Sequence, residues 1–213
     1  MRRNSWVLRK GGLMREFQIC LLAGLLAMLT GCAGVVSLHP LALPNDQDAI
    51  FDPALVGTWE EVGQQGGQDR CVVARAESGY TVTVYSGPES GGPGSRQVQF
   101  SMRLLKVGER RLLDVYTRSP ACQNDGCDNY MRPDVHLFFK LRLDKDSAWL
   151  SEMDSDWLKE QIKTGGLLRH EVLMEDDDRI VLTASPSELR RHLLPLVADD
   201  RSFERETEHR RVK

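Results

Sequence analysis

Three of the five cysteines, Cys71, Cys122 and Cys127, are the residues best placed for redox or metal chemistry. Cys122 and Cys127 flank Gln-Asn-Asp-Gly, a turn-prone tetrapeptide, so a disulfide between them would close a small loop and contribute about 2 kcal/mol at most. Pairing of Cys71 with either of them, or no bridge, are the alternatives. A metal site would need Cys122, Cys127 and His136 as ligands. However, two cysteines separated by four residues, with one distant histidine, are not a familiar zinc-binding spacing. The sequence favours the Cys122–Cys127 disulfide and no metal ligand set.

Other polar motifs fit structural roles better than catalytic ones. His170-Glu171 is not a zincin motif, because Met174 stands where the second histidine belongs. Residues 175–178 lack the spaced oxygens of a calcium loop and read as a hairpin turn. Ser185 and Asp154 stand where helix caps belong. We therefore predict no catalytic residue, no metal and no cofactor, and expect that the chain is not an enzyme.

The N-terminus has the parts of a secretory signal. Five basic residues precede an apolar stretch of 11 residues, Ile19 to Leu29. A transmembrane helix needs about 20 apolar residues, so this stretch is too short to span a bilayer. Met14 is a candidate true start, because Met14-Arg15 and the apolar run form a complete short signal.

The apolar run ends in Leu29-Thr30-Gly31-Cys32, which resembles the lipobox of bacterial lipoproteins. The resemblance implies removal of residues 1–31 and acylation of Cys32, for example with palmitate, so that Cys32 anchors the chain in a lipid bilayer. Several acyl chains make such attachment effectively permanent. Ala33 follows where an aspartate would favour inner-membrane retention. We expect the periplasmic side of the outer membrane, with the inner membrane and the cell surface as alternatives.

The charge of the mature chain excludes one class of partner. Residues 1–31 hold 5 of the 28 basic and 1 of the 31 acidic residues, which leaves 23 against 30 and a net charge of −7. A domain of that sign is a poor candidate for nucleic acid or for adhesion to anionic lipid. No basic patch with interleaved aromatic residues appears, so we expect no nucleic-acid partner.

Alternating apolar and polar residues predict a mainly β fold. Residues 71–76 and 80–85 form a hairpin, and residues 97–104 and 135–143 alternate with period two. Short helices are expected near 156–163 and 186–197, separated by a last hairpin over 167–183. Short connections favour an antiparallel meander that closes into a barrel of about 8–9 strands over a sandwich.

These elements divide the chain into four parts. Residues 1–31 are the signal peptide, and residues 32–51 are the lipidated cysteine and its tether. The β-barrel domain with its C-terminal helix is expected over 52–198. Residues 199–213 balance acidic and basic side chains and read as a solvated, charged tail.

The first strand carries a second resemblance. Gly57-x-Trp59 resembles the opening of lipocalin and other calycin barrels, in which the tryptophan plugs the closed end. The comparison implies a basic residue packed over the tryptophan; no motif marks it, and Arg210 and Arg211 are the candidates. Leu-Val-Gly-Thr-Trp-Glu at 55–60, Asp-Trp-Leu at 156–158 and the segment 182–190 are also similar to a group of uncharacterised Gram-negative outer-membrane lipoproteins. That resemblance implies a fold and a location, not an activity.

Two functions follow from such a barrel. The first is binding of a small apolar or amphipathic ligand in the barrel mouth. The ligand-lining residues would be the same-face residues of two long strands: Val98, Phe100, Met102, Leu104, Leu137, Phe139 and Leu141. The alternative is a barrel filled by side chains, as small barrels often are, whose surface docks an envelope protein partner.

Overall fold

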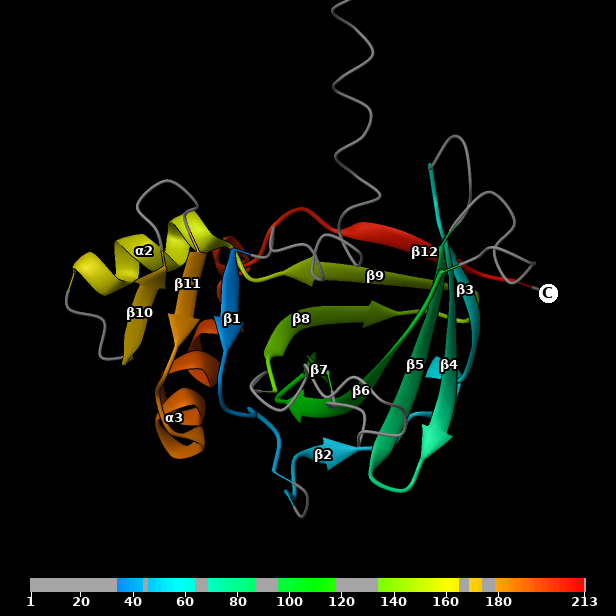
Figure 1. Ribbon diagram of the computed structural model, residues 1–213, viewed down its shortest axis with the longest axis horizontal. Coiled ribbons are helices and arrows are strands. Elements are labelled where there is room, and N and C mark those ends of the chain that lie inside the picture. The colour runs from blue at the N-terminus through cyan, green and yellow to red at the C-terminus, as the bar shows by residue number, and fades with distance from the viewer. Residues whose placement is uncertain are drawn as a thin grey trace, which may run out of the picture. The chain divides into compact units, whose positions relative to one another are not determined.

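The computed structural model describes residues 34–43, 46–63, 69–86, 96–117, 134–164, 169–173 and 179–212 (Figure 1). Met14, the acylation site Cys32 and the Cys122–Cys127 pair lie outside the described residues, so those predictions stay predictions. Among the described residues, no helix is both long and apolar enough to cross a membrane.

Eight antiparallel strands close into a barrel, as the alternation predicts. They are β3 (Gly57–Glu61), β4 (Arg70–Ala76), β5 (Gly79–Ser86), β6 (Arg96–Val107), β7 (Arg110–Tyr116), β8 (His136–Leu143), β9 (Ser147–Glu152) and β12 (Thr207–Arg211). Each strand pairs with the next in this order, and β12 pairs with both β9 and β3. The ring of hydrogen bonds is therefore complete, which leaves the barrel without a free edge. This is a calycin-like architecture (Figure 1).

The two ends of the barrel differ in their connections. The turns at residues 77–78, 108–109 and 144–146 are short and lie at the end where β3 begins, which we call the closed end. The other end, which we call the loop end, carries the longer connections 62–69, 87–95 and 117–135.

The remaining elements lie outside the barrel. They are β1 (Val35–Ser37), β2 (Ala49–Ile50), β10 (His170–Leu173), β11 (Arg179–Leu182), α2 (Ser155–Lys163), α3 (Pro186–Leu196) and the 3₁₀ turns η1 (Pro53–Leu55) and η2 (Asp200–Ser202). Strands β10, β11 and β1 form a side sheet that meets β8 where Ser37 pairs with His136. The predicted last hairpin is therefore present as β10 and β11, but it lies beside the barrel.

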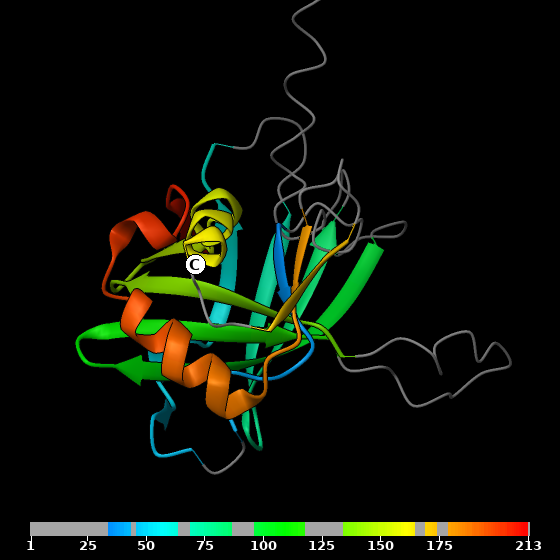
Figure 2. The same ribbon diagram turned by 90° about the vertical axis from the view of Figure 1, so that its left-hand side faces the viewer.

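A second core packs between the outer face of the barrel and α3. Leu105, Leu112 and Phe138 point outward from β6, β7 and β8 and join Leu189 and Leu193 of α3 in one buried cluster. Figure 2 shows α3 lying across these strands. The predicted capping box starts the helix: the Ser185 hydroxyl accepts the Glu188 amide, and the Glu188 carboxylate accepts the Ser185 amide.

Part of the expected tether belongs to the folded body. Strand β1 pairs in parallel with β11, β2 pairs with β6, and Leu41 and Ala42 are fully buried. The carboxylate of Asp114, also fully buried, accepts hydrogen bonds from the amides of Leu41 and Ala42 at 2.9 and 3.1 Å. Its other oxygen lies 2.6 Å from Nδ1 of His136. These contacts fix residues 41–42 on the barrel wall, so a tether over 34–51 is corrected.

The expected solvated tail is also corrected. Residues 207–211 form β12, the strand that closes the barrel, and Phe203 is buried in the second core. The inward positions of β12 are Thr207, His209 and Arg211, so the strand has no apolar alternation. Because both faces of β12 carry polar residues, the strand cannot be predicted from alternation of apolar and polar residues.

Candidate functional site

Trp59 and Arg211 build the closed end of the barrel. The indole is 3% exposed, and its Nε1 donates to the carbonyl of Leu55 at 2.9 Å. The guanidinium of Arg211 lies over the ring, 4.3 Å from its centroid, and donates to the carbonyls of Val56 and Ala54. Arg211 is thus the basic residue that the calycin comparison implies, because the neighbouring Arg210 pairs with Glu208 instead.

Gly57 is explained by the same arrangement. Its φ of 150° lies in a region that residues with a side chain rarely adopt. A Cβ atom at this position would meet the Arg211 guanidinium. The Gly-x-Trp motif therefore has a local cause: the glycine leaves room for the arginine that covers the tryptophan.

The predicted ligand-lining residues share the inner face of the barrel. Leu104, Leu113 and Phe139 stand side by side across β6, β7 and β8. The lining residues at 100, 102, 104, 137, 139 and 141 are buried, and Val98 is half-buried. Strand β5 extends this surface with Val82, which faces Phe100. One side of the interior, formed by β5 to β8, is thus an apolar wall.

The opposite side of the interior is mixed: polar side chains that the sequence analysis missed lie among the inward-facing Trp59, Val73, Ala148 and Leu150. Trp59 and Phe139 face inward, and residues that pair across neighbouring strands share a face of the sheet. The pairing therefore places five further residues on the inner face of β3, β4, β9 and β12: Glu61, Cys71, Glu152, Thr207 and His209. All five are half-buried. Glu61 could have been found by extending the period of two from Trp59 along β3, but Cys71 lies on β4 and is placed on the inner face by its pairing with Trp59. Thr207 and His209 could not have been found in this way, because β12 itself was not predicted.

Burial favours the neutral forms of three of these side chains. It raises the pKa of the Cys71 thiol to about 12, so this free cysteine is not a nucleophile near neutral pH. Burial lowers the pKa of His209 and, with the nearby charge of Glu204, raises the pKa of Glu152 to about 7.

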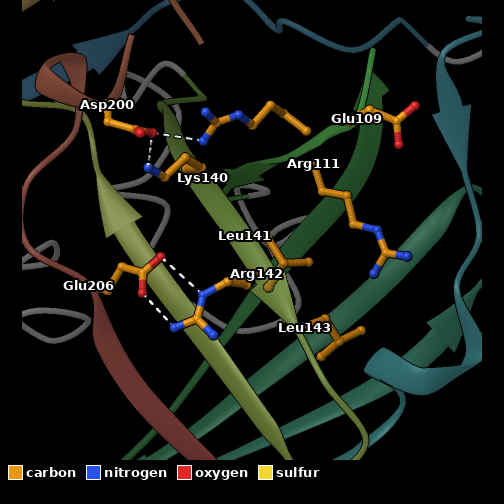
Figure 3. A pocket seen from close by; sticks show the side chains of 9 residues that line it. Glu109, Arg111, Lys140, Leu141, Arg142, Leu143, Asp200 and Glu206 are labelled. Atoms are coloured by element: carbon orange, nitrogen blue, oxygen red, sulfur yellow. Dashed lines mark hydrogen bonds and ion pairs between the residues drawn. The ribbon is translucent and has the colours of Figure 1, made fainter. Parts of the chain in front are cut away.

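A pocket of about 530 Å³ lies near the closed end and is lined by residues from both faces of β7 and β8. Figure 3 shows Asp200 beside Lys140 and Glu206 beside Arg142, and both are ion pairs. Asp200 also pairs with Arg110 at 2.7 Å. Its other lining residues are Glu109, Arg111, Leu141 and Leu143. The cations lower the pKa of Asp200 and of Glu206. The lining carries four cations against three carboxylates, and Arg111 pairs with Asp52, which lies outside the lining.

The other polar motifs have structural roles. Asp154 caps α2 by accepting the Trp157 amide at 2.8 Å, and Ser185 caps α3, as predicted. His136, a member of the alternative metal set, pairs with Asp114. Within the described part of the chain, no group of three His, Cys, Asp or Glu side chains could hold a metal ion.

No protein-family model, curated protein or solved structure matches this chain. Its class is therefore defined by its own geometry. It is a closed, eight-stranded antiparallel barrel with a calycin-like Trp–Arg closed end.

Proposed function

We propose that this protein binds a small amphipathic ligand inside its barrel while acylated Cys32 anchors it on the periplasmic side of the outer membrane. The observation that carries the ligand proposal is the inner surface: an apolar wall on β5 to β8 faces the polar side chains of Glu61, Glu152, Thr207 and His209 on β3, β9 and β12. An apolar group that enters sheds its hydration, which contributes roughly 25 cal/mol per Å² buried.

Half-buried positions on the inner face support an unfilled interior. Cys71 faces inward and keeps accessible surface. Val98 and Leu150 likewise stay half-buried although both face inward. Close-packed cores leave few such positions. On this proposal the protein binds and does not catalyse.

The anchor is supported by the sequence before the barrel. The lipobox-like Leu29-Thr30-Gly31-Cys32 ends two residues before Gly34, where the described body begins. We propose that the protein is a lipoprotein of the Gram-negative type that the sequence resembles.

A filled barrel that docks an envelope protein is the second candidate. Leu104, Phe100 and Phe139 favour it, because they are 1–4% exposed and make an ordinary core if the barrel is full. The two candidates differ in whether the interior admits a probe.

Uptake of N-phenyl-1-naphthylamine, a neutral polarity-sensitive dye, distinguishes them. The mature chain with Cys32→Ser, which lacks the acylation site, should bind the dye saturably. Phe100→Trp or Leu137→Trp should block binding while circular dichroism stays unchanged. Leu43→Trp is the matched control, since Leu43 is 44% exposed. A folded protein that takes up neither the dye nor extracted envelope lipids would favour the docking module.

A further inference from the structure

Among the described polar side chains of the interior, Glu152 is a carboxylate with an oxygen that lacks a hydrogen-bond donor. Glu152 ends β9 at the loop end and faces inward beside Phe139 of β8. Its Oε1 is buried and makes no hydrogen bond in the described part of the chain. The Glu204 amide donates to the backbone carbonyl of Glu152, 2.8 Å away, and not to its carboxylate. A buried acceptor without a donor costs free energy, so its retention calls for an explanation.

The charges around Glu152 are acidic. Its pKa is raised by burial and by Glu204, and the pKa of Glu204 is raised by burial and by Asp154 and Asp156 at the start of α2. The inward residues of the adjacent β12 are Thr207, His209 and Arg211; Arg211 lies over Trp59 at the closed end. Burial holds His209 towards its neutral form.

This arrangement discriminates between ligand charges. An anionic head group, such as a fatty-acid carboxylate, would meet the repulsion of Glu152 and Glu204. A protonated amine would give Glu152 a charge-assisted hydrogen bond and would offset the acidic field. The apolar wall of β5 to β8 lies across the interior and would take the hydrocarbon part.

We propose that the barrel selects amphipathic molecules with a cationic, hydrogen-bond-donating head group, which Glu152 accepts while the apolar part packs against β5 to β8. The proposal rests on the proposed ligand-binding function and names the class of ligand. Glu152 is the residue that determines the charge preference.

Competition among three single-chain amphiphiles tests it. Dodecylamine, dodecanol and dodecanoic acid, each below its micelle concentration, are titrated at pH 8 against bound N-phenyl-1-naphthylamine on the mature chain with Cys32→Ser. Dodecylamine should displace the dye at about a tenfold lower concentration than the acid, the factor expected for one hydrogen bond to a charged group. Dodecanol should fall between them.

Glu152→Gln, which keeps the shape and removes the charge, should reduce the preference for the amine to less than about threefold. Glu208→Gln is the matched control, because Glu208 lies on the outer face of β12 and pairs with Arg210. It should leave the order of the three competitors unchanged. Lowering the pH from 8 to 6 protonates Glu152 and should weaken the amine in the wild type but not in Glu152→Gln.

The experiment distinguishes failure of the ligand-binding function from failure of the head-group preference. If the dye itself does not bind, the proposed ligand-binding function fails. If the dye binds but the acid competes as well as the amine, or if Glu152→Gln keeps the full amine preference, the head-group proposal is overturned and the barrel remains a binder of apolar groups.

Discussion

Arg211 joins three features of the closed end: the Trp59 ring, the glycine at 57 and the carbonyls at the end of η1. Arg211→Met keeps the apolar stem but removes both hydrogen bonds and the cation–π contact. We expect the free energy of unfolding to fall by about 2–3 kcal/mol, since each lost hydrogen bond costs about 1 kcal/mol and the cation–π contact adds about as much. Urea denaturation of the mature chain with Cys32→Ser measures the loss.

Arg210→Met is the control for this variant. Arg210 is exposed and pairs only with Glu208 on the outer face, so its loss should cost about 0–1 kcal/mol. Equal losses for the two variants would mean that the Trp–Arg contact does not hold the closed end together.

Glu152 should make stability depend on pH. Its pKa is about 7 in the folded protein against 4.5 ordinarily, so between these values the folded state binds more protons than the unfolded state. Its contribution is therefore fully present below pH 4.5 and is lost as the pH rises to 7. We expect wild type to lose about 2–3 kcal/mol relative to Glu152→Gln between pH 5 and pH 8.

Paired urea titrations of both proteins at the two pH values check this sign. The difference between variants matters, because Glu188, Asp199, Asp200 and Glu206 have lowered pKa values and act in the opposite direction in both proteins. A gap between the variants that is the same at pH 5 and pH 8 contradicts a raised pKa at Glu152.

For single residues, the sequence predicts which side chains face inward only where apolar residues mark the pattern. The buried side chains of β6 and β8 repeat with period two, and Trp59 stands in a recognisable tripeptide. Glu152 and His209 carry no such signal, because a charged residue on a strand reads as solvent-facing. Only the closed register of the barrel shows that both face inward.

Strand β12 shows why one element escaped prediction. Its residues are Thr-Glu-His-Arg-Arg, and its stability comes from its neighbours: it bonds to β9 on one side and to β3 on the other. Nonlocal pairing of this kind overrides local propensity. By contrast, α3 was predicted closely, because its capping box is a local signal.

Truncation tests the role of β12. A chain ending at Glu206 loses the strand that closes the ring, which exposes the edges of β3 and β9 and uncovers the Trp59 ring. We expect loss of cooperative unfolding, or aggregation through the open edges. Thermal unfolding followed by tryptophan fluorescence measures it.

Removal of Lys213 alone is the control, because Val212, whose amide donates to Thr58, is then kept. It should leave the unfolding transition unchanged. A chain ending at Glu206 that unfolds cooperatively at the wild-type temperature would show that the ring does not need β12.

The whole molecule has two cores that share one wall. The inner faces of β6, β7 and β8 serve the barrel, and their outer faces serve the cluster under α3. Strand β1 belongs to the second core, where the Gly34 carbonyl accepts the amide of Ile180 at 2.8 Å. The chain is thus part of the fold from its first described residue onward.

This placement bounds the connection to the proposed anchor. Cys32 precedes Gly34 by two residues, and a fully extended chain spans about 3.3–3.6 Å per residue. The backbone between the proposed anchor and Gly34 can therefore span at most about 7 Å.

Metabolic labelling with a palmitate analogue tests the anchor. Wild type should incorporate the label and stay with the membranes after carbonate extraction, because several acyl chains hold it there. Cys32→Ser should lose the label and move to the soluble periplasmic fraction. Cys71→Ser is the matched control: it removes a thiol that faces the barrel interior and whose pKa burial raises to about 12, so labelling should not change. Label that persists in Cys32→Ser, or wild type that carbonate releases, would contradict acylation at Cys32 as the anchor.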